Sequence, residues 1–234
     1  MPRYSEKTFG ERYSKGRGLV EYLKQIPTYS PGNNKLLPAN LDALLDLINT
    51  ANNNAAFKLS VLQTARAERK DMYYGDAGLI KRCSQMRDFL ASMPEGKKAG
   101  DFKRLQKIVQ DIRGAKIVRK KKSGKEGEVK TKSVSERTFG SIIKQSKDAL
   151  EIIKSNAAYT PGNANITVAN FTLYLAQVDA KNSEVAEKSN SFDNARYDRS
   201  ELYIQLKDVV QKIKYALASQ YGKDSNEYKD VVKY

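Results

Sequence analysis

The chain has 234 residues, of which 40% are hydrophobic, so it is long enough to bury one large core or two small ones. It carries 42 lysine and arginine residues against 27 acidic residues, and the resulting formal charge of +15 favours acidic partners such as nucleic acid, an anionic membrane or an acidic protein surface. The single cysteine excludes an intrachain disulfide and a thiolate zinc site, and the lack of histidine removes the commonest general base and metal ligand.

The sequence opens twice in nearly the same way. Residues 5–74, aligned without a gap to residues 135–204, give 21 identical pairs in 70 positions, and the match resumes further on if the first copy holds three extra residues near the sequence YYGDAG. Each copy is far longer than a solenoid repeat, which favours a duplicated domain whose two copies share one topology and pack with pseudo-two-fold symmetry. The predicted organisation is a first helical copy over residues 1–112, a basic linker or hairpin over 113–134, and a second helical copy over 135–234.

The first element of each copy is predicted to be a helix, because apolar residues recur at steps of three and four from Phe9 to Leu23 and again from Phe139 to Ile153. Gly16 and Gly18 weaken this prediction in the first copy. A turn follows in both copies, written YSPGNN and YTPGNA, in which proline sets the first corner and glycine is expected to take a positive φ at the second.

A long second helix is predicted next. In the first copy Pro38 suits its first turn, and the pattern runs for about 35 residues to Tyr74. In the second copy Thr167 is the expected N-cap, and the more polar sequence is expected to break near Asn190. A third helix is predicted in each copy, over residues 79–90 and 206–217, and a short fourth helix over residues 100–114 closes the first copy. The predicted fold class is therefore all-α, an internally duplicated helical bundle with about three long helices and a short one per copy.

The segment between the copies departs from the helical pattern. Residues 113–132 hold nine basic and two acidic residues, and their glycine, serine and lysine content is typical of a flexible linker. The same segment also reads as two short strands around a glycine-rich turn, so a β-hairpin stays open. Because lysine outnumbers arginine and no aromatic residue is interleaved, the segment predicts attraction to a polyanion backbone rather than base readout. The candidate polyanion-binding residues are Arg113, Lys116, Arg119, Lys120, Lys121, Lys122 and Lys125.

The most specific polar pattern shared by the two copies lies late in the second helix. An arginine, a second arginine three residues later and a tyrosine four residues after that share one helix face. This pattern fits an anion-binding stripe, in which guanidinium groups grip phosphates. It fits better an internal brace, in which the arginines form ion pairs with the acids common to both first helices. The residues concerned are Arg66, Arg69 and Tyr73, their counterparts Arg196, Arg199 and Tyr203, and the acids Glu21 and Glu151.

No reaction signature is found in the sequence. A di-metal carboxylate site would need Glu-x-x-His motifs, which a chain without histidine lacks. Cys83 aligns with Val210 of the second copy and is interpreted as a small core residue. No catalytic residue, metal or cofactor is therefore predicted.

These observations favour a non-enzymatic structural or scaffold subunit of a larger assembly, such as a virion, envelope or nucleoprotein particle, with other protein subunits as partners. The alternative is a freestanding, sequence-nonspecific nucleic-acid-binding protein, and an enzyme working through arginine, tyrosine and carboxylates in a cleft between the copies is the third hypothesis. No signal peptide or apolar run of membrane-spanning length is seen. The sequence thus predicts no membrane insertion and a location in the cytoplasm or in a particle assembled there.

Overall fold

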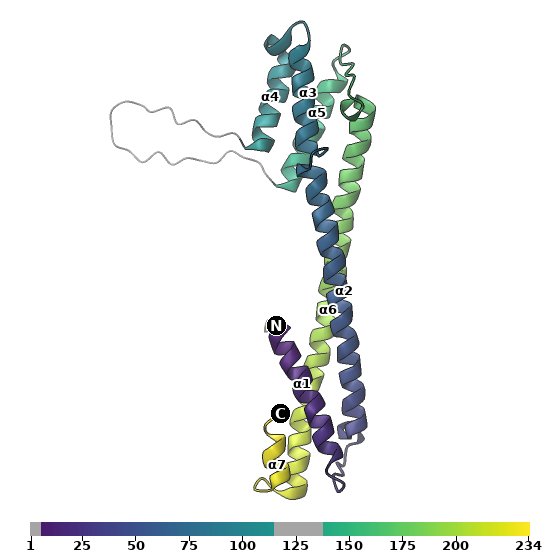
Figure 1. Cartoon of the computed structure of the whole chain (residues 1–234), viewed down its shortest axis with the longest axis vertical. Helices are drawn as coiled ribbons and strands as arrows, with labels where there is room; N and C mark the ends of the chain where they lie inside the picture. The colour runs from purple at the N-terminus through teal and green to yellow at the C-terminus, as the bar shows by residue number, and fades with distance from the viewer. Residues whose placement is uncertain (1–5, 115–137) are drawn as a thin grey trace, which may run out of the picture. The chain divides into compact units, whose positions relative to one another are not determined.

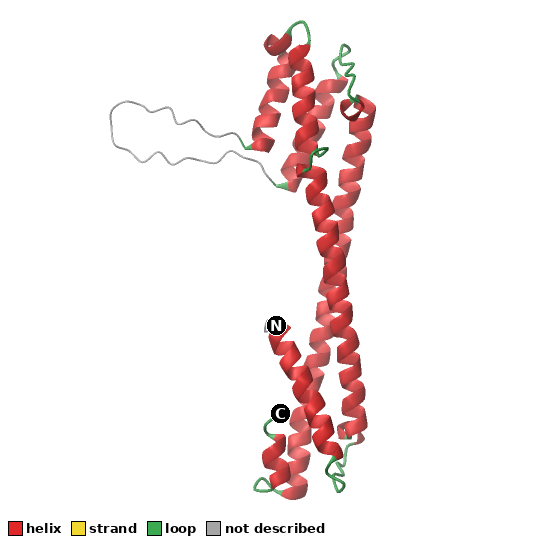
Figure 2. Ribbon diagram, in the orientation of Figure 1, coloured by secondary structure: helices red, strands yellow, loops and turns green. Residues whose placement is uncertain are grey.

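The structure is a computed structural model that describes residues 6–114 and 138–234. All the regular elements in these two ranges are helices (Figures 1 and 2), which confirms the prediction of an all-α, bundle-like chain. The linker or hairpin predicted between the copies lies almost wholly outside the described residues. No described helix combines the length and the apolar character that a membrane span requires. The helices are α1 (Glu6–Lys24), α2 (Pro38–Tyr74), α3 (Leu79–Ser92), α4 (Gly100–Arg113), α5 (Phe139–Lys154), α6 (Val168–Tyr221) and α7 (Asn226–Val231), with 3-10 turns η1 (Asn34–Leu36), η2 (Gly96–Lys98) and η3 (Ala164–Ile166).

The chain forms two compact units. Unit 1 comprises residues 1–62 and 188–234, and unit 2 comprises residues 63–187. Unit 1 therefore holds α1, η1, the first part of α2, the last part of α6 and α7, whereas unit 2 holds the remaining helices. Each compact unit thus combines a segment of the first predicted copy with a segment of the second.

The core of unit 1 is built from the apolar faces of α1, α2, α6 and α7. Gly16 and Gly18 lie inside α1, and their lack of a side chain lets neighbours approach: a Cβ on Gly16 would lie 2.7 Å from Leu45 Cδ2, and one on Gly18 would lie 2.8 Å from Tyr234 Cε1. These glycines therefore serve helix packing at the expense of helix propensity. The buried apolar residues of this core include Leu19, Val20, Leu23, Leu41, Leu45, Ile48, Leu206, Ile213, Leu217 and Val231.

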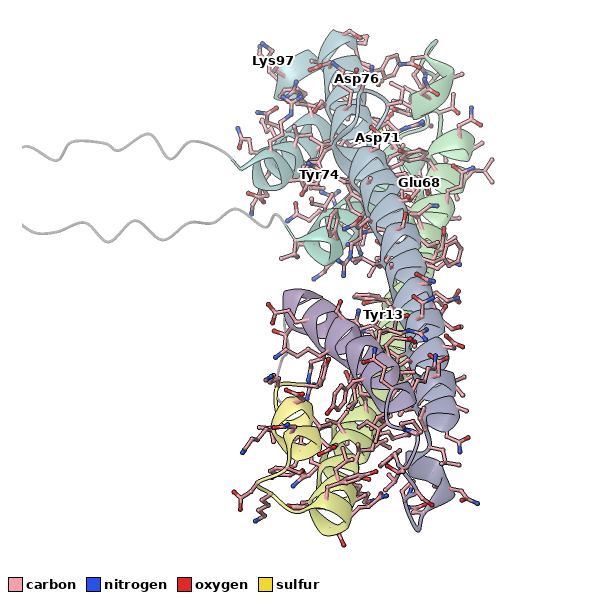
Figure 3. The ribbon with its side chains drawn as sticks, turned by 60° about the horizontal axis from the view of Figure 1, so that its bottom comes forward. Tyr13, Glu68, Asp71, Tyr74, Asp76 and Lys97 are labelled. Carbon is pink, nitrogen blue, oxygen red and sulfur yellow. The ribbon has the colours of Figure 1, made fainter. Side chains whose placement is uncertain are left out.

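An ion-pair network also joins α1 to α2 in unit 1. The Arg17 guanidinium pairs with both Asp42 and Asp46, which stand one turn apart on α2. Its Nε donates to the hydroxyl of Tyr13 at 3.0 Å, a residue that Figure 3 labels on α1. Hydrogen bonds to Asp46 and Tyr13 raise the pKa of Arg17 above its ordinary value.

The core of unit 2 is centred on α3, α4 and α5, which contact one another and lie side by side in Figure 1. The apolar faces of α2 and α6 complete it. The predicted short fourth helix is present as α4, and its residues Leu105, Val109 and Ile112 are buried in this core. The buried residues include Leu79, Cys83, Met86, Leu90, Leu105, Val109, Ile112, Ile142, Leu150, Ile153, Phe171 and Val178.

The second copy differs from the prediction, because its second and third helices are one continuous helix. Helix α6 runs from Val168 to Tyr221, so the break expected near Asn190 was wrong. The polar sequence around Asn190 is compatible with the helix because that side chain is exposed.

In the first copy the corresponding helices are separated by the turn at residues 75–78. The turn is crowded: a Cβ on Gly75 would lie 2.7 Å from the Asp71 carbonyl oxygen, and one on Gly78 would lie 2.9 Å from it. Buried Arg82 stabilises the turn, because its Nε donates to Ala77 O at 2.7 Å and its Nη1 donates to Asn165 O at 2.6 Å. Residues 75–78, which lie within the sequence YYGDAG, thus separate α2 from α3.

The two proline-glycine turns are closed by other means than expected. Neither Gly32 nor Gly162 has a positive φ, so that prediction was wrong. The buried hydroxyl of Tyr29 instead donates to Leu36 O at 3.1 Å, and that of Tyr159 donates to Ile166 O at 2.8 Å. A tyrosine hydrogen bond across each loop therefore fixes the turn without a left-handed residue. Pro38 does begin α2, and the Thr167 hydroxyl accepts from Asn170 N at 3.3 Å, as an N-cap does.

Candidate functional site

The residues of the shared helix-face pattern divide between the interior and the surface. Arg66 and Arg196 are exposed, whereas Arg199 is 6% exposed and the two tyrosines of the pattern are fully buried. The first arginine of each triplet therefore faces solvent, Arg199 and the two tyrosines belong to the core, and Arg69 is half-buried. Each inner pair forms a compact cluster with an aromatic residue and an asparagine.

In unit 1 this cluster surrounds Phe9 at the start of α1. The Arg199 guanidinium lies over the Phe9 ring at 4.4 Å from its centroid, and the Tyr203 ring packs on the same ring at 4.6 Å. The Tyr203 hydroxyl donates to Phe9 O at 3.0 Å and accepts from Asn52 Nδ2 at 3.1 Å. The tyrosine therefore joins α6 to both α1 and α2.

In unit 2 the same arrangement surrounds Phe139 at the start of α5. The Arg69 guanidinium lies 4.2 Å from the centroid of the Phe139 ring, and the Tyr73 ring lies 4.7 Å from it in an edge-on orientation. The Asn182 amide donates to the Tyr73 hydroxyl at 2.8 Å. Burial raises the pKa of Tyr73 above its ordinary value, which keeps this hydroxyl protonated.

The acids expected to pair with these arginines have other partners. Glu21 pairs with Lys24 at 2.8 Å, and Glu151 pairs with Lys154 at 2.9 Å, each one turn along its own helix. These pairs are exposed and contribute little to stability. Arg69 and Arg199 each lie over an aromatic ring, where the sequence predicted a carboxylate partner.

The predicted polyanion-binding segment is represented in the structure by its first residue. Arg113 is the exposed last residue of α4, and Gly114 caps that helix with a φ of 72°. The other six candidate residues, Lys116, Arg119, Lys120, Lys121, Lys122 and Lys125, lie outside the described residues.

The described aspartate and glutamate side chains do not form a metal-binding cluster. Figure 3 labels Glu68 and Asp71 near the end of α2, and Glu68 pairs with Lys181 at 2.8 Å. Within residues 6–114 and 138–234 no group of three cysteine, aspartate or glutamate side chains is placed to hold a metal ion.

Cys83 is fully buried in unit 2, and its Sγ lies 3.7 Å from Ser146 Oγ. Burial raises the pKa of the thiol from 9.0 to about 12. We expect the native protein to react with Ellman's reagent at least about a hundredfold more slowly than the protein in 6 M guanidinium chloride, because only the thiolate attacks. Fast labelling of the native chain, followed by absorbance at 412 nm, would contradict this placement.

A cavity of about 310 Å³ lies in unit 1 between α1 and α6. Its lining includes the apolar residues Leu206 and Val210 and two basic residues from each helix, and none of the described side chains that line it is acidic. Sequence reasoning missed this site, although Arg12 and Lys15 stand one turn apart on α1 and Lys207 and Lys214 stand two turns apart on α6. The lining residues are Arg12, Lys15, Gly16, Leu206, Lys207, Val210, Gln211, Lys214 and Tyr234.

Comparison with known proteins gives no relative of this chain. No family model matches the chain, and neither the curated proteins nor the solved structures include a match.

Proposed function

We propose that this chain is a non-enzymatic structural or scaffold subunit of a larger assembly, built from an internally duplicated helical bundle with a basic surface. The observation that carries the proposal is a row of large apolar side chains on the surface of α6 in unit 1. Tyr197, Ile204 and Tyr215 are 54%, 51% and 64% exposed, and their spacings of seven and eleven residues place them on one helix face. Single exposed apolar residues are ordinary, but an aligned row of aromatic and aliphatic side chains suits a protein contact.

The proposed duplication is supported by contacts that recur with an offset of 130 residues. Arg69 stacks on Phe139 in unit 2, whereas Arg199 stacks on Phe9 in unit 1. The tyrosine–asparagine hydrogen bonds are exchanged in the same crosswise manner, since Tyr73 pairs with Asn182 and Tyr203 with Asn52. A fused homodimer whose two copies exchange their halves would produce this reciprocity.

The contacts of the shared polar residues support a non-enzymatic role. Arg199 and Tyr203 contact the aromatic residue at the start of α1, and Tyr203 also bonds to α2. These side chains hold helices together rather than converge on an open pocket. Enzyme active sites instead gather such groups around a concave site.

The test is isolation of the tagged full-length chain from its native cells, with measurement of the stoichiometry of co-purifying proteins. We expect a partner in fixed ratio that is lost when Tyr197, Ile204 and Tyr215 are all replaced by lysine. A matched control replaces three other exposed apolar residues, Leu47, Phe57 and Leu173, which adds the same charge at scattered positions. Retention of the partner by the first variant, or its loss from both, would refute the proposal.

The alternative, a sequence-nonspecific nucleic-acid-binding protein, is favoured by the formal charge of +15. It predicts a different result in the same purification: nucleic acid would be retained at low salt and lost steeply as salt rises, with a log-log slope of about one per phosphate neutralised. A protein partner in fixed ratio that withstands salt favours the scaffold.

A further inference from the structure

A cluster of exposed cations lies on unit 2, where η2 leads into α4. Helix α4 contacts α3 and α5 and buries Leu105, Val109 and Ile112 against its neighbours, so the opposite face of this helix is turned to solvent. Basic residues occupy that face and the short η2 turn before it. The exposed cations, together named the η2–α4 patch, are Lys97, Lys98, Lys103, Arg104 and Lys107.

The charge of this patch is not neutralised by ion pairs. Within residues 6–114 and 138–234 none of the five cations takes part in an ion pair, whereas other exposed lysines pair with an acid one turn along their own helix, namely Lys24, Lys154 and Lys212. Figure 3 labels Lys97 with its side chain directed away from the helices. The patch therefore presents five positive charges to solvent.

The acidic residues nearest to the patch in the sequence do not cancel its charge. Asp101 is half-buried, and its Oδ2 accepts from Asn156 Nδ2 at 3.0 Å. Asp111 is half-buried as well, and exposed Glu95 precedes η2. Three acidic residues thus stand beside five cations, and the surface remains net positive.

The aligned segment of unit 1 forms a helix with balanced charge. Residues 222–234 align with residues 96–108, and each segment buries an apolar residue in its own unit, Val231 in α7 and Leu105 in α4. Residues 96–108 hold five basic residues and one acidic residue, whereas the aligned residues hold three of each. A helix with this sequence pattern therefore does not need the patch in order to pack, which favours a role for the patch outside the fold.

Two positions account for the difference in charge between the aligned segments. Asp224 and Asp230 of unit 1 stand where unit 2 has Lys98 and Arg104. Asp230 also pairs with Lys233 at 2.5 Å and so compensates a neighbouring cation. The two aspartates therefore give matched substitutions with which the patch can be neutralised.

The patch lacks the apolar side chains by which protein partners and membranes are held. None of the large apolar side chains that are exposed in the described residues lies between residues 96 and 113. Protein interfaces have an apolar core, and stable membrane attachment needs a second signal besides charge. Stacking of the bases of a single strand likewise needs aromatic side chains. Positive charge without these groups fits the phosphate backbone of a nucleic-acid duplex.

We propose that the η2–α4 patch binds the phosphate backbone of a nucleic-acid duplex without reading its sequence. Lys103 and Lys107 stand one helical turn apart, about 6 Å along α4, and Arg104 stands beside them, so these cations can contact neighbouring phosphates. The inference deepens the proposed function, on which it rests, by giving its basic surface a ligand. A scaffold of this kind holds nucleic acid through unit 2.

The direct test is fluorescence anisotropy of a labelled DNA duplex of about 20 base pairs and mixed sequence, titrated with the full chain at several salt concentrations. We expect a Kd of about 10⁻⁶ to 10⁻⁴ M near physiological salt, the range of nonspecific complexes. The variant Lys98→Asp/Arg104→Asp places the acids of unit 1 in the patch. It should weaken binding by about tenfold or more and reduce the log-log salt slope by about two, one for each cation removed.

Two further variants separate the patch from general charge attraction. Lys35→Asp/Lys223→Asp makes the same change in net charge at exposed positions of unit 1, and we expect less than about a threefold effect. Lys103→Gln/Lys107→Gln removes two cations without adding acids and keeps good helix formers, and we expect it to weaken binding by several-fold. The basic residues after Gly114 are unchanged in every variant. Circular dichroism checks that all variants remain folded.

Several outcomes would overturn the inference. These are no binding of the duplex at about 50 mM salt, an equal loss of affinity in the unit 1 control and in Lys98→Asp/Arg104→Asp, or an unchanged affinity in Lys103→Gln/Lys107→Gln. Tighter binding to a single strand of the same sequence also contradicts it. Binding to vesicles of phosphatidylcholine and phosphatidylserine in place of the duplex would assign the patch to a membrane instead.

The failure of this inference can be distinguished from the failure of the proposed function. If the duplex does not bind while a protein partner in fixed ratio still depends on the apolar row of α6, the inference fails and the proposed function stands. If the duplex binds through the patch and no protein partner is found in fixed ratio, the proposed scaffold role is refuted and the nucleic-acid-binding alternative is supported.

Discussion

Replacement of Tyr203 by alanine is expected to lower the free energy of unfolding by about 3–5 kcal/mol. The side chain is 1% exposed, stacks on Phe9, and bonds to Phe9 O and to Asn52. Its removal leaves a large cavity where α1, α2 and α6 meet, and it removes the hydrogen bonds to Phe9 O and from Asn52 Nδ2. Urea denaturation followed by circular dichroism measures the loss, and hydrogen exchange should show that the amides of α1 lose protection first.

Two conservative variants separate the contribution of the Tyr203 hydroxyl to the free energy of unfolding from that of its ring. Tyr203→Phe keeps the ring and removes the hydroxyl, so it should cost about 1–2 kcal/mol. Tyr197→Phe makes the same chemical change at an exposed tyrosine of the same helix and should lie within about 0.5 kcal/mol of the wild type. A Tyr203→Ala variant within about 1 kcal/mol of the wild type would show that the tyrosine cluster does not hold unit 1 together.

The sequence predicted these clusters in part, because their members are identical in the two copies. The alignment singled out Arg69, Tyr73, Arg199 and Tyr203, and helix periodicity placed each pair near one face. Their partners were not found, since a copy-by-copy reading looks for contacts within one copy. The structure instead brings Arg199 onto Phe9, which is far from it in the sequence. Such a contact is a property of the tertiary arrangement, and local periodicity carries no information about it.

Helix boundaries show the same division between local and tertiary information. A break near the sequence YYGDAG was predicted from the alignment, and α2 does end there at Tyr74. By contrast, the sequence of α6 did not indicate that its polar middle would stay helical. Likewise, the turn was predicted to depend on a positive φ at Gly32. It is closed instead by a hydrogen bond from the buried Tyr29 hydroxyl to Leu36 O. The basic cavity was missed because its cations come from α1 and α6, which are far apart in the sequence.

The protein is expected to lose most of its stability between pH 9 and pH 12. Burial raises the pKa of Cys83 from 9.0 to about 12 and that of Tyr29 from 10.0 to about 12, and it also raises the pKa of Tyr159. In this range the unfolded chain has released protons that the folded chain still holds, so the free energy of unfolding falls as pH rises. One pH unit of difference corresponds to about 1.4 kcal/mol, so the thiol contributes a loss of about 4 kcal/mol and Tyr29 one of about 3 kcal/mol by pH 12. Together these losses are a large share of the stability of an ordinary domain, about 5–15 kcal/mol.

Urea titrations at pH 8, 9, 10, 11 and 12 measure this loss, and absorbance at 295 nm reports tyrosinate formation. At pH 8 these groups are almost wholly protonated in both states and add little pH dependence. Cys83→Ala should flatten the decline that begins near pH 9, whereas Tyr29→Phe should flatten only the part above pH 10. Tyr29→Phe also loses the hydrogen bond to Leu36 O, at a cost of about 1 kcal/mol. Its free energy of unfolding is therefore lower than that of the wild type at pH 8, and the difference narrows as pH rises. A wild-type protein whose unfolding free energy is constant from pH 9 to pH 12 would show that these hydroxyl and thiol groups are not held protonated by the fold.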